Sequence, residues 1–231
     1  MTMGIMVISF VFMILGMLVQ FRLKSKFKQY SAVPTSSRLS GKEVAQKMLK
    51  DNGIYDVEVV SVPGFLSDHY DPTKKTVNLS PDVFEGRNVA AAAVAAHECG
   101  HAVQHATAYS MLQLRSKLVP VTQISTNLSQ WVILAGIGFM GLGGGNQTIL
   151  LIGIVLFAVS TLFTVVTLPV EFDASARALN WLNTANITTS DEDAKAKDAL
   201  KWAALTYVVA ALSSIAMLAY YIMVYNSRSR D

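Results

Sequence analysis

Residues 118–170 read LVPVTQISTNLSQWVILAGIGFMGLGGGNQTILLIGIVLFAVSTLFTVVTLPV and contain no Asp, Glu, Lys, Arg or His over 53 residues. A single helix of this length would measure about 80 Å, whereas the hydrocarbon core of a bilayer is about 30 Å thick. The stretch is therefore expected to cross a membrane twice, as helices over 126–143 and 148–168. The break falls at residues 143–147, a polar and glycine-rich segment with no apolar side chain to offer lipid.

Two further uncharged runs predict one more membrane span towards each end of the chain. Residues 4–21 are almost wholly apolar, and cations begin only after them, at Arg22. A cleavable signal peptide carries its positive charge before the apolar run, so this segment is expected to remain as a transmembrane anchor. Residues 203–225 form the other run, and tyrosines lie towards both of its ends, as in the aromatic belts of membrane helices.

The composition agrees with a membrane protein. The 231 residues are 52% hydrophobic and only 15% charged, whereas soluble domains average roughly 25% charged residues. The net charge of +3 is too small to predict a nucleic-acid partner. Cys99 is the single cysteine, which excludes an intrachain disulfide.

Four spans would leave residues 22–118 and 171–202 on the same side of the membrane. These two polar segments hold 17 of the 19 Lys and Arg residues. Because cytoplasmic segments carry an excess of positive charge, both are expected to lie in the cytoplasm. The predicted location is therefore the cell membrane, with several spans and the lipid bilayer as a partner.

The first polar segment is expected to contain a short helix and two strands. Ser40 and Glu43 have the spacing of a capping box, and apolar residues follow at helical intervals. Residues 55–62 and 76–79 are rich in β-branched side chains and predict two short strands, with a turn-rich link at 68–75.

Longer helices are expected in the rest of the polar sequence. An alanine-rich helix is predicted over 88–118, ahead of Pro120, which would end it. A second helix is predicted over 171–183, and a third begins after Ser190 and leads into the last span. The expected fold class is thus mainly α with a small β element, in an integral membrane protein with about four transmembrane helices.

Residues 97–101 read HECGH, which matches the pattern HExxH. Two histidines four positions apart lie on one face of a helix about 6 Å apart, so both imidazoles can bind one zinc ion. Glu98, between them, can act as the general base towards the attacking water. This spacing predicts a zinc metallopeptidase with His97 and His101 as metal ligands, Glu98 as the catalytic residue and one zinc ion per chain.

A catalytic zinc site needs a third protein ligand. His105 lies eight residues after His97, a rise of about 12 Å, which is too far for both to join one tetrahedral shell with His101. We therefore expect His105 to support the site from outside or to be structural. Glu171 is the better candidate, because it is the first charged residue after the uncharged stretch and two crossings return it to the side of the histidines.

Three stretches in combination resemble the YugP-type membrane zinc metallopeptidases. They are GRNVAAAAVAAHECGHAVQH at 86–105, DHYDP at 68–72 and LPVEFDASARAL at 168–179. The resemblance covers essentially the whole chain. It implies a membrane-embedded zincin-like protease of the gluzincin kind, distantly similar to the HtpX and CAAX-protease group, with catalytic segments in the cytoplasm.

The resemblance also implies that Glu171 completes the ligand set of the two motif histidines. In the HtpX-like group, an aspartate four residues after the ligand glutamate supports a histidine ligand. Here that position is Ser175, whereas Asp173 lies two residues after the glutamate, so both are candidates for supporting the ligands. Cys99 points away from the histidines by helical phase and is expected to be a packing residue.

The expected reaction is hydrolysis of a peptide bond in proteins or peptides near the membrane, membrane proteins among them. A donor to the oxyanion is also needed. The candidates are His69, Tyr70, Tyr109 and Arg177. His69 could equally be an ordinary turn residue, and the strand over 76–79 is a candidate for the edge along which an extended substrate pairs.

Three alternatives remain open. An intramembrane site-2-type protease places HExxH inside a full-length span, whereas here the apolar part before His97 covers only residues 89–96. A catalytically silent zinc-binding membrane scaffold would close its metal site with a fourth protein ligand. A transporter has little support, because the four predicted spans hold no ionisable residue apart from tyrosines.

Overall fold

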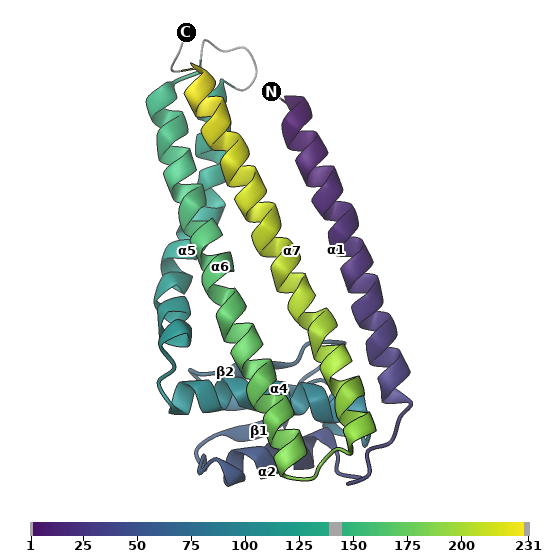
Figure 1. Cartoon of the computed structure of the whole chain (residues 1–231). Helices are drawn as coiled ribbons and strands as arrows, with labels where there is room; N and C mark the ends of the chain where they lie inside the picture. The colour runs from purple at the N-terminus through teal and green to yellow at the C-terminus, as the bar shows by residue number, and fades with distance from the viewer. Residues whose placement is uncertain (1, 139–144, 229–231) are drawn as a thin grey trace. The chain divides into compact units, whose positions relative to one another are not determined.

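A computed structural model of the chain describes residues 2–138 and 145–228 and is mainly helical with one small sheet (Figure 1). The elements in chain order are α1 (Thr2–Ser31), α2 (Gly41–Asp51), β1 (Glu58–Ser61), β2 (His69–Asp71), β3 (Thr76–Leu79), α3 (Pro81–Phe84), α4 (Val89–Ala106), α5 (Ser110–Ile137), α6 (Gln147–Thr184) and α7 (Ser190–Arg228). The chain divides into two compact units. One contains the residues up to Leu18, Leu114–Leu168 and the chain from Thr206 onward, and the other contains Val19–Gln113 and Pro169–Leu205.

Three of the described helices are long and apolar enough to cross a membrane, at Met3–Ser31, Gln147–Thr184 and Ser190–Arg228. They include the predicted spans over 4–21, 148–168 and 203–225. The fourth prediction, over 126–143, is not among them, because the described part of α5 carries many Ser, Thr, Asn and Gln side chains. Its last residues, and the first part of the predicted glycine-rich break, fall in 139–144, outside the described residues.

Within the first unit, α5 and α6 approach each other closely. A Cβ added at Gly136 would lie 2.4 Å from the backbone nitrogen of Leu150, so only a glycine fits this crossing. Arg228 of α7 satisfies the end of α5: its Nη1 and Nη2 donate to the carbonyl oxygens of Gly136 and Ile137 at 3.1 and 2.8 Å. These bonds cap carbonyls that have no partner within their own helix.

Two helix predictions were wrong at their boundaries. The alanine-rich helix ends at Ala106 instead of residue 118, because Ala108 takes a positive φ of 52° and turns the chain before α5. Pro120 does not end a helix but lies inside α5, and the residues from Glu171 start no new helix because α6 is continuous from Gln147 to Thr184. The helix from Ser190 into the last span agrees with its prediction.

The sheet has the order β1-β3-β2. β3 matches the predicted strand over 76–79 and lies in the centre, parallel to β1 and antiparallel to β2. It is therefore not an edge, and the expectation that a substrate pairs along it was wrong. β1 is shorter than the predicted strand over 55–62, and β2 lies in the link over 68–75 that was expected to be turns.

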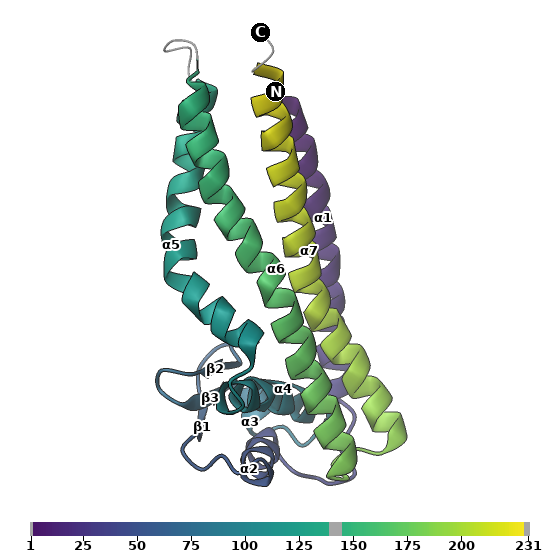
Figure 2. The same cartoon turned by 60° about the vertical axis from the view of Figure 1, so that its left-hand side comes forward.

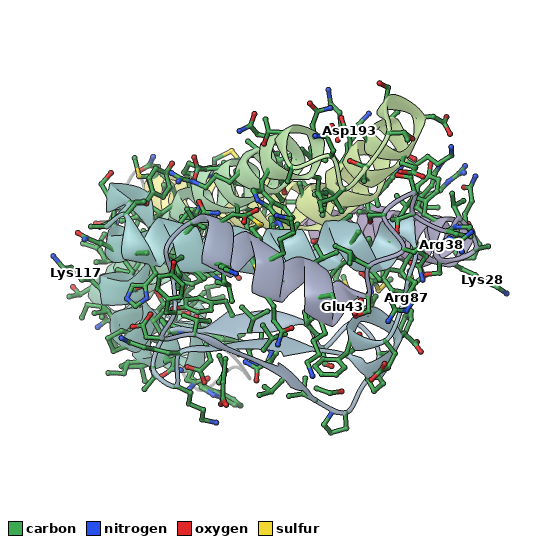
Figure 3. The ribbon with its side chains drawn as sticks, turned by 90° about the horizontal axis from the view of Figure 1, so that it is seen from below. Lys28, Arg38, Glu43, Arg87, Lys117 and Asp193 are labelled. Atoms are coloured by element: carbon green, nitrogen blue, oxygen red, sulfur yellow. The ribbon has the colours of Figure 1, made fainter. Side chains whose placement is uncertain are left out.

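The core of the second unit lies between α2, α4 and the sheet, which Figure 2 shows gathered together. The capping box of Ser40 and Glu43 is present at the start of α2, and the apolar face of this helix packs on the alanine-rich face of α4. Glu43 also pairs with Arg87 at 2.8 Å, and Figure 3 shows these two side chains next to each other. Small alanine side chains let α4 lie close to its neighbours, which positions the HExxH residues.

The segment between α1 and α2 is tied to the beginning of α7. The backbone nitrogen and Oγ of Ser36 donate to the two carboxylate oxygens of Glu192 at 2.9 and 3.0 Å. The hydroxyl of Tyr30 donates to Asp198 at 2.6 Å, and Lys26 pairs with the same carboxylate at 2.8 Å. These contacts fix the polar parts of α1 and α7 in the second unit.

Candidate metal centre

The HExxH residues lie on the middle turns of α4. Asn88 caps this helix, because its side-chain oxygen accepts a bond from the backbone nitrogen of Ala91 at 2.9 Å. Gly100, within the motif, faces the backbone of α6: an added Cβ would lie 2.6 Å from the carbonyl oxygen of Ala174. The glycine therefore lets α6 approach α4 closely enough to bring its side chains to the histidines.

His97, His101 and Glu171 converge, as the sequence predicted. Their potential ligand atoms all lie within 4.8 Å of one another. Oε2 of Glu171 is 3.4 Å from Nε2 of His97 and 3.6 Å from Nε2 of His101. Ligands of a tetrahedral zinc ion at 2.0–2.1 Å stand about 3.3–3.4 Å apart, so the chemistry of this donor set and its two distances from Glu171 fit zinc.

Glu98 is buried next to this group, with 8% of its surface exposed. Burial raises the pKa of its carboxyl, while the neighbouring imidazoles of His97 and His101 act in the opposite direction. A carboxyl group with a raised pKa is suited to take up and release a proton near neutral pH.

His101 is held by a chain of hydrogen bonds through Gln104. Nε2 of Gln104 donates to the carbonyl oxygen of Val170 and to Oδ2 of Asp173, both at 2.8 Å. Because two acceptors fix the amide nitrogen, its oxygen faces Nδ1 of His101, at 3.0 Å. An amide oxygen can only accept, so Nδ1 of His101 must carry the proton and Nε2 is left with the lone pair that a metal requires.

His97 is held by a different partner. The Oγ of Ser175 lies 3.1 Å from its Nδ1. The position that carries an aspartate in the HtpX-like group is thus also in contact with a histidine here. Asp173 reaches His101 only through Gln104, and it also accepts a bond from Nε of Arg177 at 2.6 Å.

The contacts found for the other predicted residues are with partners outside the three converging side chains. His105 Nδ1 is 2.9 Å from the hydroxyl of Tyr70, which joins the end of α4 to β2. His69 is exposed on β2, and its Nδ1 lies 2.8 Å from the carbonyl oxygen of Ser67. Arg177 packs over the ring of Tyr109, with 5.7 Å between the guanidinium carbon and the ring centroid.

Cys99 faces the core, as predicted, and its surface is completely buried. Its sulfur lies 3.5 Å from the carbonyl oxygen of Ala45 on α2.

Gln104 is the residue that the sequence analysis missed. It is fully buried, which is uncommon for glutamine. Its position three residues after His101 places it on the same helix face, and this spacing was the one available signal. The partners that define its role, Val170 and Asp173, lie more than 60 residues later and could not be assigned from the motif.

Comparisons with known proteins identify the family of the chain. Residues 5–226 match a family described as "Putative neutral zinc metallopeptidase". The chain is also 41% identical over 213 residues to "Putative membrane protease YugP" of Bacillus subtilis (strain 168), with 92% of each chain covered. No solved structure matches it significantly.

Proposed function

The chain belongs to the family described as "Putative neutral zinc metallopeptidase", and from this premise we propose that it is a membrane-embedded, zinc-dependent endopeptidase with a zincin-like catalytic region. The observation that carries the proposal is the convergence of His97, His101 and Glu171, whose ligand atoms have the chemistry of a three-ligand zinc site and lie within 4.8 Å of one another. Three protein ligands leave one tetrahedral position for water and substrate, as in catalytic zinc sites.

In the proposed mechanism, the two imidazole Nε2 atoms and the carboxylate of Glu171 hold the metal. A bound zinc ion would supply Lewis acidity, which lowers the pKa of a water to about 7 and polarises the scissile carbonyl. Glu98 accepts the proton of the attacking water and later donates it to the leaving amine. Gln104 and Ser175 hold the two imidazoles in the orientation that this chemistry needs.

The remaining parts of the proposal concern the membrane. Three apolar helices support several spans, and we propose the region around α5 as a fourth. The concentration of Lys and Arg in residues 22–118 and 171–202 supports catalytic segments that face the cytoplasm. Proteins or peptides near that surface, membrane proteins among them, are then the proposed substrates. α4 is not among the three apolar helices of the described residues, which disfavours a site-2-type intramembrane protease.

The test is zinc content together with hydrolysis of casein by the purified full chain. Glu98→Gln is expected to keep about one zinc per chain and lose hydrolysis, whereas Glu171→Ala is expected to weaken zinc binding. Glu58→Gln, an exposed change on β1, is the matched control and should leave both unchanged.

Two results would contradict the proposal. Hydrolysis that survives Glu98→Gln would remove this residue from the mechanism. Stoichiometric zinc without hydrolysis of casein or of membrane-protein substrates, even in the wild type, would favour the catalytically silent scaffold.

A further inference from the structure

A cavity of about 410 Å³ lies between α6 and α7 within the second unit. Its lining comes from Phe172, Ser175, Ala176, Leu179, Lys197, Leu200, Lys201, Ala204 and Leu205. Its volume is in the range of small-molecule sites, and nearly all of its exposed lining is apolar. We refer to it as the α6–α7 groove.

The groove changes character along its length. At one end, Phe172 of α6 and Leu205 of α7 lie next to the apolar runs predicted to cross the membrane, over 148–168 and 203–225. Lys201 lies one helical turn further from the last span, and Lys197 lies one turn beyond it. The groove is therefore apolar where it meets the predicted bilayer boundary and cationic further out, which is the polarity of a phospholipid with an anionic headgroup.

Both lysines are available for a ligand. Their side chains are exposed, and neither forms an ion pair with another residue in the described ranges 2–138 and 145–228. The acid between them in the sequence, Asp198, has its carboxylate bound by Lys26 and Tyr30 of α1, and it acts on Lys201 only through its charge and not through a direct contact. Two positive charges one turn apart thus border the same apolar cavity, and neither forms a direct ion pair among the described residues.

We propose that the α6–α7 groove binds one anionic phospholipid of the bilayer, with an acyl chain between Phe172 and Leu205 and the phosphate at Lys197 and Lys201. Basic pockets between membrane helices bind anionic headgroups on the cytoplasmic side in this way. An acyl chain that leaves the bilayer gains little hydrophobic free energy, since it was already in apolar surroundings. The groove therefore sets where the lipid lies, and the lysines set which headgroup is preferred.

The groove borders the metal centre through one shared residue. Ser175 lines it and also contacts Nδ1 of His97, the ring nitrogen that faces away from Glu171. A molecule in the groove would thus lie on the Ser175 side of the His97 ring.

The test is native mass spectrometry of the detergent-purified full chain, titrated with palmitoyl-oleoyl phosphatidylglycerol or with phosphatidylcholine of the same acyl chains. One phosphatidylglycerol is expected to bind in preference to phosphatidylcholine. Lys197→Gln combined with Lys201→Gln should weaken that site on the order of 10-fold to 30-fold, from the known contribution of a lysine near an anionic surface. Ala176→Phe fills the groove without changing charge and should also displace the lipid.

Lys24→Gln combined with Lys28→Gln is the matched control, because these two lysines are also four residues apart and follow an apolar run. It should leave the preferred site intact. Equal loss in both lysine pairs would overturn the proposal in favour of general attraction to anionic lipid. The proposal would also be overturned if Ala176→Phe bound phosphatidylglycerol as strongly as the wild type, or if the wild type showed no preference for phosphatidylglycerol over phosphatidylcholine. Because the readout is bound lipid, none of these outcomes depends on peptidase activity.

Discussion

The Oγ of Ser175 lies 3.1 Å from Nδ1 of His97, on the far side of the imidazole from the nitrogen that faces Glu171. Ser175 and Glu171 are one turn apart on α6, so one helix supplies both a candidate ligand and the partner of another ligand. The orientation of His97 is therefore coupled to the position of α6. A hydroxyl group at this place can donate or accept, so it supports the metal-binding state of the ring.

Replacement of this hydroxyl should weaken the metal site. Ser175→Ala is expected to lower zinc affinity about 10-fold, the lower end of the effect of losing a partner of a metal-bound histidine. Competition with a chromophoric zinc chelator measures it. Ser175→Thr keeps the hydroxyl and should stay near the wild type. Equal affinity in the alanine and threonine variants would show that the contact with His97 does not contribute.

Gln104→Leu is expected to have a larger effect, because it removes the acceptor for His101 and leaves Val170 and Asp173 without their buried donor. Zinc affinity should fall roughly 10-fold to 100-fold. The absorption spectrum of the cobalt-substituted protein should also change, because the orientation of His101 is no longer fixed. Gln46→Leu, an exposed change on α2, serves as the control. An unchanged cobalt spectrum in Gln104→Leu would contradict the positioning role.

Gly100 is expected to be required for packing. Its added Cβ would lie 2.6 Å from the carbonyl oxygen of Ala174, and backbone atoms cannot rotate away. Gly100→Ala should therefore destabilise the protein by about 1–3 kcal/mol and lower its melting temperature. Gly16→Ala is the same change in α1, where nothing lies within 4 Å of the added atom, and should be neutral or slightly stabilising. A similar melting temperature for the two variants would refute this packing role.

Asp68 should make stability depend on pH. Its carboxylate accepts bonds from the backbone nitrogen and Oγ of Ser80 at 2.7 and 3.0 Å, but burial raises its pKa above the ordinary value. The folded state then binds the proton more tightly than the unfolded state. The resulting stabilisation is complete below the unfolded pKa of about 3.9 and is lost as pH rises through the folded pKa.

Asp68→Asn removes this ionisation and should raise the melting temperature relative to wild type at pH 7, with a smaller difference at pH 4. Asp71→Asn should instead lower the melting temperature relative to wild type at pH 7. Backbone bonds from Lys74 and Thr73 lower the pKa of Asp71, so its charge stabilises the fold above pH 4 and its loss should lower the melting temperature at pH 7. Thermal unfolding of the metal-free protein in detergent across this pH range measures both. If the melting temperatures of the two variants depended on pH in the same way, the opposite pKa shifts of Asp68 and Asp71 would be contradicted.

Local patterns predicted some elements closely and others poorly. The capping box of Ser40 and Glu43 depends on residues three positions apart, so the start of α2 was correct. β2 was missed because its three residues carry turn-type neighbours and form a strand only by pairing with β3. The turn at Ala108 contains no glycine or proline, so nothing in the local sequence marked the end of α4.

More of the candidate site than of the surrounding fold could be predicted from the sequence. The spacing of HExxH is a property of one helix, and the expectation that Glu171 lies close to the histidines agrees with their convergence, whereas the count of membrane crossings behind it stays a prediction. Gln104 could not be assigned in the same way, because its role depends on a residue pair of α6. The edge of the sheet could not be predicted either, since it requires the strand order.

The division of the candidate ligands between α4 and α6 has a consequence for biosynthesis. A ribosome adds His97 and His101 long before it adds Glu171, and the long uncharged stretch, part of which is proposed to cross the membrane, is made in between. A growing or truncated chain that stops before α6 holds two of the three candidate ligands. It also lacks Ser175, which contacts His97, and Asp173, which accepts a hydrogen bond from Gln104. If the proposed function holds, such a chain should bind zinc weakly and cleave nothing, so that proteolytic activity would appear only after α6 has been made and folded against α4.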